Sequence, residues 1–282
     1  GNLYGWGSNY AGALFTGDNT DRLTNTLLTG AFLLDIGEYF TAFSTGDDFS
    51  VVATSNGEVY SAGNNTIGQL GDSTIAQRNT PTLISGSMNL ADGEYVTHIE
   101  SYLHTIVSTN QNRVFGWGWN RGECIGDDIG IYVYSPYEIT SALNLSEEEE
   151  IAGISASSGN SYVLTNNNDY YSWGTNGYGK FMFGYYEVNL SPVPLKGHKN
   201  FDIIKIKEYL VPHVELISST YRHTVVKTES EQIYVWGFNL DGALGTGDKE
   251  NRIVPYEITN SLNLGVTETV TMIVTGDIHT VF

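Results

Sequence analysis

Three histidines are the residues of this sequence whose type and spacing could support metal chemistry. His104, His223 and His279 occupy one column of a repeated pattern, and Phe49 and Ser161 fill that column in the two other copies. Converging imidazoles can hold zinc, but a metal site needs a complete set of ligands. Because two copies lack an imidazole there, we expect the histidines to pack within strands, and we predict no metal and no cofactor.

Acidic side chains are the second group that could hold an ion, and they recur in turns. None of these turns has the alternating carboxylate spacing of a calcium loop that ends in glutamate. The run from Glu147 to Glu150 falls at the same bend as Asp92 and Glu94. We interpret both bends as solvated. The remaining acidic turns are Asp47–Asp48, Gly71–Asp72, Asp127–Asp128 and Gly247–Asp248.

Catalytic motifs are absent from the sequence. It contains no glycine-rich phosphate loop ending in Lys-Ser or Lys-Thr, no His-Glu-x-x-His and no Gly-x-Ser-x-Gly. These patterns place phosphate-binding amides, a zinc ion or an activated serine. The glycine-rich segments that do occur belong to a structural repeat. We therefore predict no catalytic residues and a protein that is not an enzyme.

The charge balance narrows the class of partner. The chain carries 32 acidic and 13 basic residues, a formal net charge of −19. Nucleic acid binding depends on clustered basic side chains, so we expect no nucleic acid partner. Anionic membrane surfaces repel such a chain, and no apolar run reaches the length of a membrane span, so we expect no membrane insertion. Cys124 is the single cysteine and forms no intrachain disulfide.

Five copies of one pattern, about 56 residues apart, organise the chain. Each has a Trp-Gly or Ala-Gly dipeptide, an asparagine two residues later and, in four copies, a proline at a fixed offset. The dipeptides are Trp6–Gly7, Ala62–Gly63, Trp117–Gly118, Trp173–Gly174 and Trp236–Gly237. The asparagines are Asn9, Asn65, Asn120, Asn176 and Asn239. We expect the asparagines to be structural, bonding backbone within their own glycine-rich turns.

Each copy is predicted to form four short strands. In the second copy we predict strands over 57–63, 82–84, 95–99 and 103–108, the last of them apolar on both faces. Four strands in a repeat of this period are typical of a propeller blade. The sequence therefore predicts an all-β fold, a single β-propeller domain of residues 1–282 built from five four-stranded blades.

The chain begins and ends at complementary points of the repeat. The copies cover about 1–56, 57–111, 112–167, 168–230 and 231–282, and the segment 1–7 matches 57–63. We expect 1–7 to pair with 275–282, which would close the ring and remove two sheet edges. The alternative is that the five copies form part of a larger propeller.

The repeat resembles that of the regulator of chromosome condensation family. The shared motif is Gly-x-Val-Tyr-x-Trp-Gly-x-Asn-x-x-Gly-Gln-Leu-Gly followed by Thr-Pro, and it is clearest at 57–71 with Thr80–Pro81 and at 234–245. The resemblance covers essentially the whole chain. It implies a propeller, which in this family usually has seven blades.

The resemblance leaves three functions open. The first is a non-enzymatic scaffold that binds a protein partner of unknown identity, in an extracellular or bacterial cell-surface setting, with the cytoplasm as the alternative. The second is guanine nucleotide exchange on a small GTPase, carried over from the founding family member. The third is a structural component of a larger assembly. Fold alone does not choose among them.

The loops after the asparagine column differ most between copies. Residues 127–134 and 181–190 are rich in aromatics, whereas the other copies carry mostly small and polar residues there. Aromatic side chains dominate the energetics of protein interfaces, so we predict that these loops form the partner surface. The predicted partner-binding residues are Trp119, Tyr132, Tyr134, Phe181, Phe183, Tyr185 and Tyr186.

Overall fold

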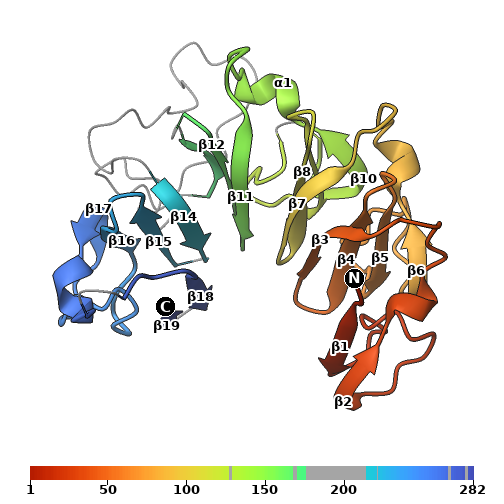
Figure 1. The fold of residues 1–282 in the computed structure, drawn as a ribbon, viewed down its shortest axis with the longest axis horizontal. Coiled ribbons are helices and arrows are strands. Elements are labelled where there is room, and N and C mark those ends of the chain that lie inside the picture. Colours follow the sequence, from red (N-terminus) through yellow and green to blue (C-terminus); the bar gives the residue numbers. More distant parts are fainter. Residues whose placement is uncertain (127–128, 168–169, 176–213, 221, 266–267, 277–278) are drawn as a thin grey trace. The chain divides into compact units, whose positions relative to one another are not determined.

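A computed structural model describes residues 1–126, 129–167, 170–175, 214–220, 222–265, 268–276 and 279–282 (Figure 1). These residues form antiparallel sheets, with short helical turns at α1 (Thr140–Leu143), Thr29–Ala31, Ser85–Ser87 and Thr259–Leu262. The all-β class is thereby confirmed. The chain divides into two compact units, unit 1 (residues 1–145) and unit 2 (residues 146–282).

Unit 1 holds a two-stranded sheet and two four-stranded sheets. The two-stranded sheet pairs β1 (Tyr4–Gly7) with β2 (Arg22–Leu27). The next sheet has the order β3 (Phe40–Thr45), β4 (Phe49–Thr54), β5 (Val59–Gly63) and β6 (Arg78–Leu83). The third has the order β7 (Val96–Ser101), β8 (His104–Thr109), β9 (Val114–Trp119) and β10 (Tyr132–Glu138).

Unit 2 repeats the same plan. One sheet has the order β11 (Ile151–Ser157), β12 (Asn160–Thr165) and β13 (Tyr170–Gly174). A four-stranded sheet has the order β14 (Val214–Ser219), β15 (His223–Thr228), β16 (Ile233–Gly237) and β17 (Arg252–Glu257). The last two strands, β18 (Val274–Gly276) and β19 (His279–Val281), pair with each other.

The sheets do not coincide with the sequence copies. The four strands predicted within one copy lie in two sheets, because β5 and β6 pair with β4 and β3, while β7 and β8 pair with β9 and β10. Residues 55–58 are a tight hairpin turn that joins β4 directly to β5, whereas residues 84–95 run from one sheet to the next. Each four-stranded sheet therefore combines the second half of one copy with the first half of the following copy.

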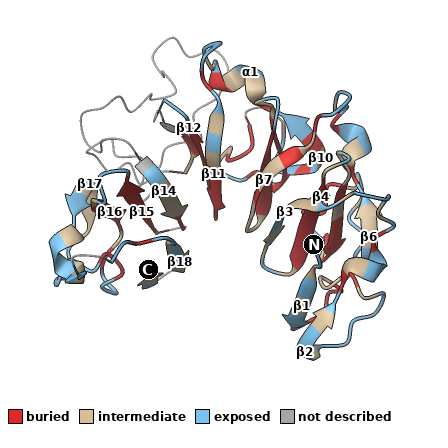
Figure 2. Cartoon of the chain, in the orientation of Figure 1, coloured by how far each residue is buried: buried red, intermediate tan, exposed pale blue. Residues whose placement is uncertain are grey.

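The second strand of each larger sheet forms the core. Every residue of β4, β8, β12 and β15 is buried (Figure 2). This confirms the prediction that the last strand of the second copy is buried on both faces. The inward aliphatic side chains include Val51, Ile106, Val163 and Val225. Full burial of such a side chain contributes roughly 1.5–3 kcal/mol.

The asparagine turn is best seen at Asn65, which is buried. Its Oδ1 accepts the Leu70 N–H at 3.0 Å, and its Nδ2 donates to the carbonyls of Thr74 and Ala76 at 3.0 and 3.1 Å. Nδ2 also donates to Asp72 Oδ1 at 2.9 Å. An irregular loop has no strand ladder to satisfy its backbone groups, so a buried amide takes that role.

Three other turns use the same bond. Asn9, Asn120 and Asn239 accept the N–H of the residue five positions later at 2.9, 2.8 and 2.9 Å. Asn9 and Asn239 donate in turn to the carbonyls of Asp18 and Asp248, each at 3.0 Å. The fifth asparagine of the column, Asn176, lies outside the described residues.

A compensating exchange links the first two copies. A Cβ on Gly71 would lie 2.8 Å from Trp117 Cδ1, so this glycine makes room for the indole, whose Nε1–H donates to the Gln69 carbonyl at 3.0 Å. In the preceding pair, Ala62 replaces the tryptophan and Phe15 replaces the glycine. Phe15 is buried in one cluster with Ala62 at a φ of 60°, a left-handed conformation that favours glycine. The phenyl ring therefore fills space that an indole fills elsewhere.

We predict that Asn65→Ala lowers the free energy of unfolding by about 1–2 kcal/mol, because buried backbone groups lose their partner. Asn64→Ala is the matched control, since the side chain of Asn64 only accepts the exposed Thr66 N–H. Urea unfolding of both variants tests this, and equal stability of the two would contradict the structural role.

We predict that Phe15→Gly and Ala62→Trp each destabilise unit 1 but largely compensate when combined. The first leaves a cavity, with a cost of about 3 kcal/mol or more, and the second overpacks, with a cost of about 1–3 kcal/mol. The double variant recreates the pair formed by Gly71 and Trp117. A double-mutant cycle from urea unfolding measures the coupling, and simply additive losses would refute the exchange.

Candidate protein-interaction surface

Trp119 and Tyr132 are brought together by the β9–β10 pairing. They are directly opposite in the register, so their side chains project to the same side of the sheet. The Trp119 N–H donates to the Leu103 carbonyl at 3.1 Å and its side chain is half-buried, while Tyr132 is 40% exposed. Two of the predicted partner-binding residues therefore form one cross-strand pair.

The loop between these strands is pinned at both ends. The Asn120 N–H donates to the Ile131 carbonyl at 2.7 Å, and Asn120 Nδ2 donates to the Gly126 and Gly130 carbonyls at 2.7 and 2.9 Å. The buried Cys124 thiol donates to the Trp119 carbonyl at 3.2 Å. This bonding fixes the strand ends and so holds the aromatic pair in place.

Tyr134 continues the aromatic row but also packs on the neighbouring turn. Its ring centroid is 6.3 Å from that of Tyr132, and its carbonyl accepts the Ser73 N–H at 2.8 Å. A Cβ on Gly68 would lie 2.6 Å from Tyr134 Cδ1, so the ring lies against this glycine. With 42% of the residue still exposed, Tyr134 contributes both to packing and to the surface.

Two exposed isoleucines extend this row and were missed from the sequence. Ile131 adjoins Tyr132, and Ile75 belongs to the loop that the Ser73 bond holds beside Tyr134; both are exposed. Ile75 is the single large aliphatic side chain in a polar turn, which is the signal that could have identified it. We call these five residues the β10 surface: Ile75, Trp119, Ile131, Tyr132 and Tyr134.

The remaining predicted partner-binding residues lie outside the described part of the chain. These are Phe181, Phe183, Tyr185 and Tyr186. Their place beside the β10 surface stays a prediction.

The strand register corrects one member of the predicted histidine column. His104, His223 and Phe49 pair with the glycines of the Trp-Gly column, and in the remaining sheet Asn160 does so, not Ser161. Ser161 was placed in the column wrongly, because apolar patterning alone tolerates a shift of one residue.

The two buried histidines lie in different local settings. Burial lowers the pKa of His104 to about 3, which keeps its imidazole neutral. His223 Nε2 lies 2.8 Å from the Thr280 hydroxyl, and His279 is exposed. Within the described residues, no group of three His, Cys, Asp or Glu side chains could hold a metal ion.

The bends predicted to be solvated contain buried glutamates. Glu94 and Glu149 are both buried, and each accepts the backbone N–H of the residue three positions earlier, at 2.9 and 2.7 Å. The solvated interpretation is therefore wrong for these two residues, because the carboxylate turns inward to close the bend. Glu38 and Glu268 make the same bond in the other described bends, at 2.7 Å each.

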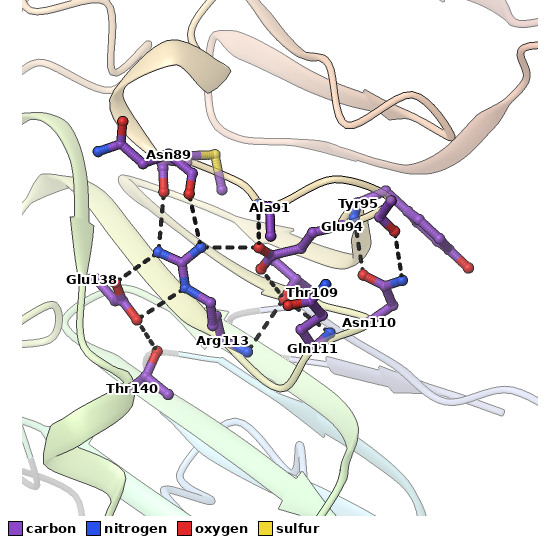
Figure 3. Close-up of polar contacts among 12 residues, drawn as sticks. Asn89, Ala91, Glu94, Tyr95, Thr109, Asn110, Gln111, Arg113, Glu138 and Thr140 are labelled. Atoms are coloured by element: carbon purple, nitrogen blue, oxygen red, sulfur yellow. Dashed lines mark hydrogen bonds and ion pairs between the residues drawn. The ribbon is translucent and has the colours of Figure 1, made fainter.

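Arg113 joins one of these bends to the adjacent strands (Figure 3). Its guanidinium is 3.0 Å from Glu94 Oε2 and 2.8 Å from Glu138 Oε2. It also donates to the carbonyls of Met88 and Asn89 at 3.1 and 3.2 Å. The donors are saturated by internal acceptors, so Arg113 is a structural clamp.

Two glutamates in unit 1 have pKa values shifted in opposite directions. Burial would raise the pKa of Glu94, but hydrogen bonds from the Ala91 N–H, Thr109 and Arg113 together lower it. Burial raises the pKa of Glu100 to about 7. A carboxyl group whose pKa is lower in the folded state than in the unfolded state stabilises the fold above its unfolded-state pKa, and this stabilisation is lost as the pH falls. A carboxyl group whose pKa is raised on folding destabilises the fold as the pH rises.

We predict that Glu100→Gln raises the free energy of unfolding at about pH 8 and leaves it unchanged at about pH 4, since only the ionised form is disfavoured. Glu94→Gln should do the reverse and destabilise the protein at the higher pH. Urea unfolding of both variants at the two pH values tests this. A pH-independent effect of Glu100→Gln would show that its titration is not the cause.

The sheets and turns define a class of protein. Four-stranded antiparallel sheets, repeated along the chain with asparagine-centred turns at one end, are those of a β-propeller repeat protein. The repeats are those of the regulator of chromosome condensation (RCC1) family. The RCC1 repeat model matches residues 56–101 and 230–282, and a second model of the same repeat matches residues 40–69.

Known proteins agree with this assignment. The chain is 27% identical over 260 residues to an RCC1 repeat-containing protein of Dictyostelium discoideum, which covers 90% of this chain and 50% of that protein. It is 27% identical over 240 residues to the ultraviolet-B receptor UVR8 of Arabidopsis thaliana, covering 84% and 49%. The chain thus spans about half the length of these relatives.

A solved structure supports the fold independently. Prp20p of Saccharomyces cerevisiae, a protein with binding properties to Gsp1p and histones, superposes with a TM-score of 0.71 at 18% identity. The match covers 97% of this chain and 63% of that one. In the described part of the chain, no helix has the length and apolar character needed to cross a membrane.

Proposed function

We propose that this chain is a non-enzymatic scaffold that binds a protein through the β10 surface. The observation that carries the proposal is a group of four exposed apolar residues, Ile75, Ile131, Tyr132 and Tyr134, beside the half-buried Trp119. Contiguous apolar surface of this kind is characteristic of protein interfaces. The aromatic residues at 181–186 would extend the same surface, and an extracellular or cell-surface setting remains part of the proposal.

The relatives suggest kinds of activity to test but do not identify the partner of this chain. Binding to Gsp1p is a property of Prp20p, so guanine nucleotide exchange on a small GTPase is the alternative to test here. A structural role in a larger assembly is the other alternative. A scaffold binds one protein saturably and does not accelerate nucleotide release from it. This difference separates the scaffold function from guanine nucleotide exchange.

We predict that truncating the cross-strand pair weakens binding but leaves folding intact. After capture of a partner on the purified chain, Trp119→Ala and Tyr132→Ala should each reduce affinity by a factor corresponding to about 2 kcal/mol. Tyr137→Ala is the control, since Tyr137 is also exposed on β10 but lies farther along the strand. Unchanged affinity with lowered melting temperature would show that the pair is core. Accelerated nucleotide release from a small GTPase would favour the exchange alternative.

We also propose that the end strands complete one blade. In unit 1, Trp6 of β1 is exposed whereas Trp117 of β9 is fully buried. In unit 2, His279 of β19 is exposed whereas His223 of β15 is fully buried. Both exposed positions belong to two-stranded sheets that have half the strands of a complete sheet.

The blade register predicts which end residues would pair. Thr224 is opposite Trp236 in β15–β16, so Thr280 should face Trp6. With Cys124→Ser as background, Trp6→Cys combined with Thr280→Cys should form an intramolecular disulfide on mild oxidation. Disulfides that form only between molecules, or none, would favour five blades as part of a larger propeller.

A further inference from the structure

The connection between β2 and β3 exposes aliphatic side chains to solvent. Leu33 is 92% exposed, Ile36 is completely exposed, and Tyr39 follows as a half-exposed aromatic. Single exposed apolar residues are common, but three within one short connection form a patch that calls for a physical reason. We call Leu33, Ile36 and Tyr39 the β2–β3 knob.

The fold does not require apolar residues at the positions of Leu33 and Ile36. Asn89 and Asn144 correspond to Leu33, while Asp92 and Glu147 correspond to Ile36. All four counterparts are exposed, including Asn89 and Asp92, which lie in the connection between two complete sheets. These positions are therefore solvent-facing in the second and third copies, which carry polar side chains there, whereas the first copy carries Leu33 and Ile36.

The connection that carries the knob is held rigidly. The Asp35 N–H donates to Glu38 Oε2 at 2.7 Å, and the Glu38 N–H donates to the Asp35 carbonyl at 3.1 Å. The Ser55 N–H donates to the Tyr39 carbonyl at 2.9 Å, and Phe32 is buried beneath the connection. A surface that is already ordered loses little conformational entropy on binding.

Carboxylates border the knob. Asp35 is exposed, Glu38 is half-buried, and Glu58 accepts the Tyr60 hydroxyl at 2.6 Å. Burial and that hydrogen bond raise the pKa of Tyr60, and the charges of Glu58, Glu38 and Asp35 add to the rise.

The wider charge of unit 1 has the same sign. Residues 1–145 contain fifteen acidic side chains, four arginines and no lysine. Three of those arginines are committed to internal ion pairs, with Asp18, Asp72 and Glu94. This balance disfavours a second copy of the chain and an anionic membrane as occupants of the knob.

The knob and the β10 surface lie at opposite ends of their strands. Phe40, which follows the knob, pairs with Thr54 at the end of β4. Trp119 ends β9 directly after Gly118, and the counterpart of Gly118, Gly63, pairs with Phe49 at the start of β4. A partner at one surface therefore leaves the other accessible.

We propose that the β2–β3 knob is a second docking site, which takes a partner element with an apolar stripe bordered by lysine or arginine. One face of a basic amphipathic helix has this chemistry. Leu33, Ile36 and Tyr39 contact the apolar stripe, and the basic border pairs with Asp35 and Glu58, while Glu38 keeps its inward bond to the Asp35 N–H. The site does not depend on the partner proposed for the β10 surface.

The test uses a synthetic amphipathic helix of leucine and lysine and a counterpart with glutamate in place of lysine. We expect the lysine peptide to bind the chain saturably in isothermal titration, and Leu33→Asn with Ile36→Asp to weaken it at least tenfold. The variant should fold normally, because the second copy carries these residues at the same positions. Ile36→Asp adds a negative charge, so attraction by charge alone would tighten binding instead.

Ile75→Asn is the matched control, since Ile75 is an exposed isoleucine of the β10 surface. Equal affinity of wild type and the knob variant, or an equal loss in Ile75→Asn, would overturn the proposal. Equal binding of the glutamate peptide would do so as well. Self-association that the knob variant abolishes, or sedimentation with phosphatidylcholine vesicles that it abolishes, would assign the knob to a second copy or a membrane instead.

Discussion

A buried side-chain amide that satisfies the backbone of an irregular turn is the interaction on which this architecture depends. After each Trp-Gly strand the chain leaves the sheet, and its peptide groups have no ladder partner until the outer strand begins. Asn65, with bonds to Leu70, Thr74 and Ala76, supplies donor and acceptor from one point. A carboxylate could accept these bonds but not donate them, which explains why the column is asparagine.

The copies are interlocked, so their residues vary in pairs. Trp117 needs Gly71, and Ala62 needs Phe15, although Phe15 must then adopt a backbone conformation that favours glycine. Tyr134 against Gly68 is a further contact of one copy with the turn of its neighbour. Close packing makes each such interface intolerant of a change on one side only. A repeat protein built in this way is stabilised by neighbours as much as by each copy.

The same scaffold presents different chemistry at its two ends. The β10 surface lies where the asparagine turns are, and the β2–β3 knob lies at the end closed by inward glutamates such as Glu38 and Glu94. In both places the backbone is fixed by hydrogen bonds that recur between copies, while the exposed side chains differ between copies. Membership of the RCC1 repeat family accounts for the first property, and only the second can select a partner.

The sequence by itself predicted five copies and determined the all-β class, the buried strand of the first four copies and the asparagine column, because each is a periodic pattern of residue types. It also singled out Trp119, Tyr132 and Tyr134 as candidate partner-binding residues, since these aromatics depart from the repeat. The offset between copies and sheets was decided only in three dimensions, because strand pairing follows the short turn at 55–58 and not the repeat boundary. Glu94 is indistinguishable in sequence from a solvated acid, and only the inward path of its bend shows that it is buried. Leu33 and Ile36 have the composition of core residues, and their exposure follows from the tertiary position of a connection whose counterparts face water in the second and third copies.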